Sequence, residues 1–77
     1  MGSSGTQSKS GSLQQIENLK RSIEHLQWRI ENNRNKMAGA SKSMKEMLKR
    51  SIAQDKAQIA EHRKAIARIR EVMKNSR

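Results

Sequence analysis

Apolar residues recur along most of this chain at spacings of three and four. With Ile16 at position a of a heptad, the successive a and d positions hold Ile16, Leu19, Ile23, Leu26, Ile30, Asn33, Met37, Ala40, Met44 and Met47. A second series with the same spacing holds Leu48, Ile52, Asp55, Ile59, His62, Ile66, Ile69 and Met73. Such spacing is typical of a helix that packs along another helix. The pattern therefore predicts an all-α chain with a coiled-coil seam.

The two series are out of phase by one residue. The first series predicts an a position at Ser51, whereas the a positions of the second begin at Ile52. A shift of one residue rotates the apolar stripe by roughly 100°, so one straight helix cannot keep both series on one face. We therefore expect an antiparallel coiled-coil hairpin of two helices, at about 13–47 and 51–75, with a turn near residues 48–52.

Local signals disagree about the position of this turn. Three capping boxes, which are typical of helix starts, pair Ser12 with Gln15, Ser43 with Glu46 and Ser51 with Gln54. Ser43 favours a turn at the nearby Gly39, and Ser51 favours the later turn. Because the first series stays in phase from Met37 to Met44, we place Gly39 and Ala40 within the first helix. Glycine there would cost about 1 kcal/mol relative to alanine.

A turn near residue 50 makes the first helix about ten residues longer than the second. Residues 13–23 then have no partner within the hairpin, and the stripe of Ile16, Leu19 and Ile23 would be exposed. We expect this segment either to fold back as a short N-terminal helix or to be covered by another molecule. Residues 1–12 are rich in Gly and Ser, and we interpret them as a disordered linker, partly an expression remnant. The hairpin domain would then comprise residues 13–75.

Composition limits the choice of function. The chain has 77 residues, no Cys, and a formal net charge of +10 from 17 Lys and Arg against 7 Asp and Glu. A chain of this length forms one small domain. Its charge favours acidic partners, which include an acidic protein surface, anionic lipid and nucleic acid. No apolar run approaches the ~18 residues of a membrane span, and we expect a cytoplasmic protein that a partner recruits to membranes.

Few residues suggest chemistry. His25 and His62 lie far apart along the chain, and no nucleophile accompanies them. We therefore expect no catalytic site, no metal and no cofactor. Trp28 falls at position f, on the outer face of its helix. It is either a partner anchor, as tryptophan often is, or it packs beneath the folded-back N-terminal segment.

Two segments resemble a known family. Met37-Ala38-Gly39-Ala40-Ser41, followed by a basic helical stretch, and Ile59-Ala60-Glu61-His62-Arg63-Lys64-Ala65-Ile66-Ala67-Arg68-Ile69 are similar to homology region one, a Rho-effector repeat. Such repeats occur in protein-kinase-C-related kinases, fungal protein kinase C, rhotekin and rhophilin. The resemblance covers roughly residues 15–73. It implies an antiparallel hairpin, often with a short N-terminal helix packed back on it, and a regulatory segment that binds a GTP-loaded Rho-family GTPase.

This resemblance gives the first functional hypothesis, a non-enzymatic module that docks a helix face on the GTPase. The expected partner-binding residues are Trp28, Arg34, Lys45, Lys49, Lys56, Arg63 and Lys64. The expected scaffold residues are Ile30, Met37, Gly39, Ala40, Ile59, Ile66 and Ile69. Basic residues would steer the encounter, and the module itself would be a monomer or a weak homodimer.

Two alternatives belong to other classes. In one, a basic hairpin dimerises through Ile16, Leu19 and Ile23 into a four-helix bundle that binds nucleic acid by charge. In the other, the chain is a structural coiled-coil segment of a larger assembly. The position of the turn discriminates among them. A turn at Gly39 makes two nearly equal helices and favours the nucleic-acid-binding bundle, whereas a turn near residue 50 with a folded-back N-terminal segment favours the Rho-effector repeat.

Overall fold

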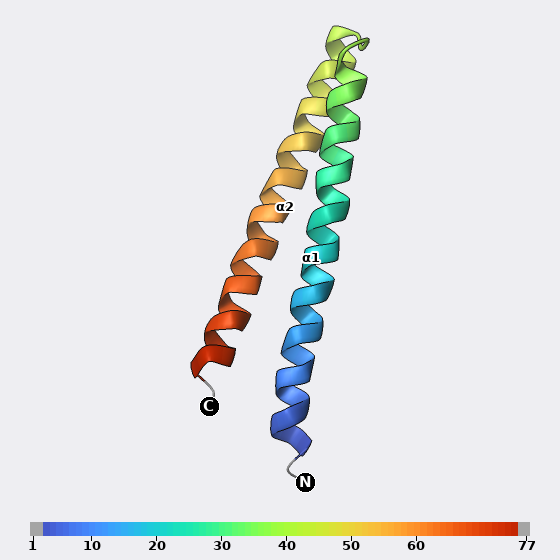
Figure 1. The fold of residues 1–77 in the computed structure, drawn as a ribbon. Helices are drawn as coiled ribbons and strands as arrows, with labels where there is room; N and C mark the ends of the chain where they lie inside the picture. Colours follow the sequence, from blue (N-terminus) through green and yellow to red (C-terminus); the bar gives the residue numbers. More distant parts are fainter. Residues whose placement is uncertain (1–2, 76–77) are drawn as a thin grey trace.

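The chain forms two long antiparallel helices that lie side by side (Figure 1). The computed structural model describes residues 3–75, with helix α1 at Ser3–Met37 and helix α2 at Lys42–Asn75. The Cα atoms span 60 × 15 × 14 Å, so the molecule is a narrow rod. The all-α helical hairpin predicted from the heptads is confirmed.

A single apolar seam holds the two helices together. Its buried side chains are Ile16, Ile23, Leu26 and Ile30 from α1 and Ile52, Ile59 and Ile66 from α2. Four partly buried side chains, Leu19, Met37, Ile69 and Met73, pack against them. All of these residues occupy the a and d positions predicted above. Each helix alone would expose a continuous apolar stripe, and packing one stripe on the other removes both from water.

The turn lies ten residues earlier than the heptads suggested. Residues 48–52 are inside α2, and the chain reverses at residues 38–41. The amide of Ala40 donates a hydrogen bond to the carbonyl oxygen of Met37 (3.2 Å), which tightens the end of α1. Ser41 then caps α2, because its Oγ accepts a hydrogen bond from the amide of Met44 (3.3 Å). The predicted turn at residues 48–52 is therefore wrong.

The one-residue slip between the two heptad series occurs within this turn. When the heptad of α2 is counted backwards from the a position at Ile52 and the d position at Leu48, Met44 and Met47 fall outside the a and d positions. Their side chains are 48% and 63% exposed. Methionines at plausible heptad positions made the first series look continuous. Gly39 and Ala40 lie in the turn and not in the helix–helix seam, which corrects their assignment as scaffold residues.

Gly39 is not required by the geometry of the turn. The described residues contain no glycine with a positive φ, and a Cβ built on Gly39 meets no atom within 4 Å. Its effect is therefore on helix propensity, since glycine is about 1 kcal/mol less favourable than alanine in a helix interior. With Ser41 as a cap two residues later, the sequence favours a break here.

The early turn gives the N-terminal half of the chain a partner. The two helices have 35 and 34 residues, and α1 begins at Ser3, ten residues before the expected start. Ile16 and Ile23 are buried in the seam with α2, so the expected exposed stripe and the folded-back N-terminal helix are both wrong. In Figure 1 the beginning of α1 extends past the end of α2.

Candidate functional site

Heptad positions define two flanks along the rod. In an antiparallel pair, the e positions of both helices border one side of the seam and the g positions border the other. The e positions hold Leu13, Lys20, Gln27 and Arg34 in α1, and Lys49, Lys56, Arg63 and Arg70 in α2. We call the six cations among them the basic flank. All six are exposed, and no ion pair joins any of them among the described side chains, those of residues 11–75.

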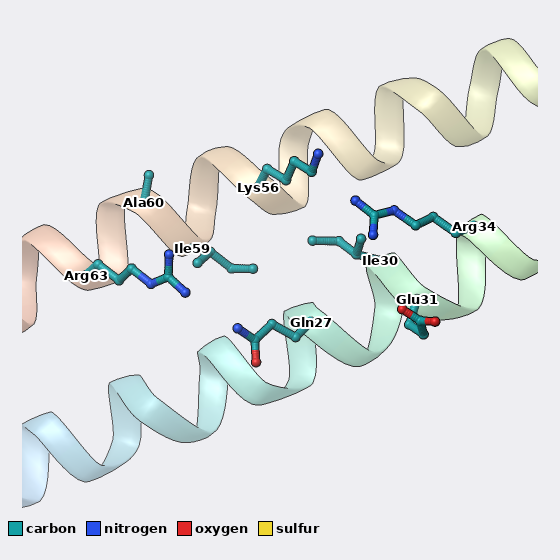
Figure 2. A pocket seen from close by; sticks show the side chains of 8 residues that line it. All are labelled: Gln27, Ile30, Glu31, Arg34, Lys56, Ile59, Ala60 and Arg63. Atoms are coloured by element: carbon teal, nitrogen blue, oxygen red, sulfur yellow. The ribbon is translucent and has the colours of Figure 1, made fainter.

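A groove lies halfway along the basic flank (Figure 2). It has a volume of about 450 Å³ and is lined by Gln27, Ile30, Glu31, Arg34, Lys56, Ile59, Ala60 and Arg63. Figure 2 shows Ile30 and Ile59 between the two helices, with Arg34, Lys56 and Arg63 extending around them. The floor of this middle groove is therefore apolar, and its walls are cationic.

A second groove, which we call the outer groove, lies farther along the same flank, toward the ends of the chain. It has a volume of about 500 Å³ and is lined by Leu13, Ile16, Glu17, Lys20, Arg70, Met73 and Lys74. Its composition repeats that of the middle groove, with apolar side chains between the helices and cations on both walls. The two grooves lie one after the other along the basic flank.

The opposite flank has only two cations at its g positions, against six at the e positions of the basic flank. Its g positions hold Gln15, Ser22, Arg29 and Lys36 in α1, and Met44, Ser51, Gln58, Ala65 and Val72 in α2. Here Asn33 Nδ2 donates a hydrogen bond to Ser51 Oγ (3.4 Å), and Arg29 Nε lies 3.4 Å from Asp55 Oδ2. Both contacts fit one antiparallel register, which they fix across the seam.

Asp55 is the one buried charged residue in the described part of the chain, with 3% of its surface exposed. Its Oδ2 has no hydrogen-bond partner, so the contact with the half-exposed Arg29 is an ion pair without a hydrogen bond. A buried carboxylate held in this way contributes to register more than to stability. It is a structural feature of the seam and lies on the flank opposite the grooves.

Positive charge also gathers around the turn. Residues 32–54 contain six exposed cations, Arg34, Lys36, Lys42, Lys45, Lys49 and Arg50, which we call the turn cluster. The only acidic residue in this range is Glu46. The turn end therefore carries five of the ten net positive charges on less than a third of the 77 residues.

The residues expected to bind a partner do not form one site. Arg34, Lys56 and Arg63 meet at the middle groove, and Lys45 and Lys49 belong to the turn cluster. Lys64 lies 3.8 Å from Glu61 in an exposed ion pair.

Trp28 is 63% exposed and stacks on His25, with ring centroids 6.4 Å apart. The alternative that it packs beneath a folded-back segment is therefore wrong.

The partner-binding residues expected from the sequence do not include Lys20 and Arg70, although both line the outer groove. The signal was present as a row of cations at seven-residue intervals in the second helix. It was not recognised because the misplaced turn put α1 and α2 in the wrong register.

Among residues 3–75, no three His, Asp or Glu side chains are placed to share a metal ion. Neither α1 nor α2 contains a stretch of the length and apolarity needed to cross a membrane. Comparison with protein-family models, with curated proteins and with solved structures found no match.

Proposed function

We propose that this chain is a non-enzymatic binding module that holds nucleic acid by charge through the turn cluster. The observation that carries the proposal is the concentration of six exposed cations around one acid at the turn end. Lys and Arg side chains that neutralise phosphates release condensed counterions, and this release supplies most of the affinity of non-specific binding.

The shape of the turn end supports contact with phosphates and not with bases. The Cα atoms of the rod span 15 × 14 Å across its long axis, already wider than the ~12 Å major groove of B-form DNA. Two adjacent helices therefore rest on the sugar–phosphate backbone. The single tryptophan lies on α1 outside the turn cluster, so the cluster has no aromatic side chain for base stacking. We expect binding with little sequence preference.

The turn position also bears on the choice among hypotheses. A turn at residues 38–41 makes two nearly equal helices, the geometry that favours the dimeric four-helix bundle that would bind nucleic acid. One part of that hypothesis is wrong, however. Ile16 and Ile23, expected to form the dimer contact, are buried between α1 and α2. The binding proposed here therefore requires no dimer.

Titration of the protein with two unrelated DNA duplexes at several salt concentrations tests the proposal. The test variant combines Lys42→Gln, Lys45→Gln and Arg50→Gln, three turn-cluster residues that line neither groove. The matched control combines Arg21→Gln, Lys64→Gln and Arg68→Gln, which removes the same charge elsewhere. We expect the test variant to lower the slope of log affinity against log salt by about 2 to 3, at roughly 0.9 per phosphate contact. Equal losses in both variants, or no binding by the wild type, would contradict the proposal.

A second candidate function is recognition of a GTP-loaded Rho-family GTPase, which the family resemblance implies. Two observations support it: the antiparallel hairpin, and the convergence of Arg34, Lys56 and Arg63 on one groove. One observation weighs against it, because a turn near residue 50 with a folded-back N-terminal segment favours the Rho-effector repeat, whereas the chain reverses at residues 38–41.

A panel of Rho-family GTPases, each loaded with GDP or a non-hydrolysable GTP analogue, tests this second candidate. Preferential binding of one GTP-loaded member, lost in Arg63→Ala and retained in Arg68→Ala, would support it. Absence of binding in both nucleotide states would exclude the tested GTPases as partners.

A further inference from the structure

The basic flank carries its charges at a regular interval. Lys49, Lys56, Arg63 and Arg70 follow one another every seven residues along α2. At a rise of 1.5 Å per residue this interval is about 10 Å. An extended surface with evenly spaced cations suits a partner whose negative charges repeat at the same interval.

The floor between these cations is apolar. Ile30 and Ile59 form it in the middle groove, and Leu13, Ile16 and Met73 contribute to it in the outer groove. Leu13 is 54% exposed, so apolar surface remains available at that end. Ala60 is exposed beside Ile59, and its small side chain leaves room for another backbone to approach.

These features exclude two occupants. A second copy of the hairpin would place its own six cations against these six, and like charges at close range repel. A nucleic acid would pair with the cations but would leave the exposed side chains of Leu13 and Ala60 without apolar contacts, because its backbone is polar and charged. The occupant that satisfies both features is a helix with an apolar stripe and acidic residues on either side of it.

We propose that the basic flank is a docking channel for an acidic amphipathic helix of a partner protein. The apolar stripe of that helix packs between the two walls, against the exposed Leu13 and Ala60, which completes a three-helix bundle. Carboxylates at positions e and g of the docked helix repeat every seven residues and reach the cations on the walls, as charged flanking positions do in coiled coils. This surface shares Arg34 and Lys49 with the turn cluster, to which nucleic-acid binding is assigned, but its Lys56, Arg63 and Arg70 lie outside that cluster.

The acidic residues of α1 give the docked helix a preferred side. Glu17, Glu24 and Glu31 all occupy b positions, one step farther from the seam than the e positions on that wall. Glu17 and Glu31 each line a groove. The α2 wall carries cations without a parallel acidic row, and the docked helix therefore places its denser acidic edge along α2.

A synthetic peptide provides the probe. It has four heptads with Leu at a and d and Glu at e and g, and the repulsion between glutamates disfavours self-association at neutral pH. A scrambled peptide of the same composition lacks the stripe and serves as the ligand control. Fluorescence anisotropy measures the affinity of the intact 77-residue protein for each peptide.

Three protein variants test the site. The first variant removes three cations from the α2 wall by combining Lys56→Ala, Arg63→Ala and Arg70→Ala. We expect its affinity for the peptide to fall at least about tenfold, with a larger loss at low salt than at high salt. The matched control, Arg21→Ala with Lys64→Ala and Arg68→Ala, should bind within about twofold of the wild type. Ala60→Glu places a charge on the groove wall without removing a cation, and we expect it to weaken binding as well. Circular dichroism confirms that each variant remains helical.

The proposal is overturned if the wild type binds neither peptide, if it binds the scrambled peptide equally well, or if the groove variant and the control lose affinity alike. A DNA duplex that competes through Lys56, Arg63 and Arg70 and displaces the peptide would assign the channel to nucleic acid instead. The Lys42/Lys45/Arg50 variant should retain peptide binding, so this result is separable from that for the turn cluster.

Discussion

Arg29 Nε lies 3.4 Å from Asp55 Oδ2, and this ion pair is the only charged contact between α1 and α2 in the described residues. Asp55 occupies a d position of the seam, where every neighbouring layer is built mainly from isoleucine and leucine. The pair therefore combines a buried carboxylate with a half-exposed guanidinium. Substitution of each partner in turn tests how much the ion pair contributes to the free energy of unfolding.

Replacement of Asp55 by leucine should stabilise the hairpin by about 1–3 kcal/mol. A buried ion pair that lacks full hydrogen bonding often contributes less than well-packed apolar residues of similar volume. Urea unfolding followed by circular dichroism at 222 nm measures the change. A lower midpoint in the leucine variant would show that the ion pair contributes net stability.

Replacement of Arg29 by alanine should destabilise the hairpin by about 1–3 kcal/mol, because it leaves the buried Asp55 carboxylate without a partner. The same substitution in the Asp55→Leu background should have an effect of less than about 0.5 kcal/mol. This double-mutant cycle isolates the coupling between the two side chains. Equal effects of Arg29→Ala in the two backgrounds would argue against that coupling.

Replacement of Gly39 by alanine should stabilise the protein by about 0.4–1 kcal/mol. The φ angle of Gly39 is not positive and a Cβ there meets no atom, so alanine fits the turn and reduces the conformational entropy of the unfolded chain. Thermal melting provides the measurement, with Gly11→Ala as a second open glycine site for comparison. A loss of stability would show that the turn needs the freedom of glycine.

Replacement of Ser41 by alanine should destabilise α2 by about 1 kcal/mol, because the amide of Met44 loses its capping oxygen. Ser43→Ala is the matched control, since Ser43 begins a capping box in the sequence but lies within α2. We expect the control to change stability by less than about 0.5 kcal/mol. The reverse order of effects would place the cap at Ser43.

The helices and their seam were predictable because apolar spacing reports directly on which face of a helix is buried. Ile30, Ile59 and Ile66 are buried where the heptads placed them, and Met37 and Ile69 pack against this core. The turn was not predictable in the same way. A slip in phase shows that a break exists but not where it occurs, and Met44 and Met47 happened to continue the first series.

The cap at Ser41 was also hidden from sequence. Ser41 is followed three residues later by Met44, whereas a capping box requires Glu or Gln at that position. Ser43 and Ser51 satisfied that pattern but lie inside α2. The basic flank could not be predicted without the correct position of the turn. Lys56 and Arg63 face Gln27 and Arg34 only in the register that an early turn produces.

The reversal at residues 38–41 brings the first and last described residues to one end of the rod and leaves the turn at the other (Figure 1). A fluorophore, surface linker or fused domain attached at either of those ends would therefore stand off from the turn cluster by most of the 60 Å length of the rod. In such a fusion, the length of the rod would keep the turn at a distance from both tethered ends.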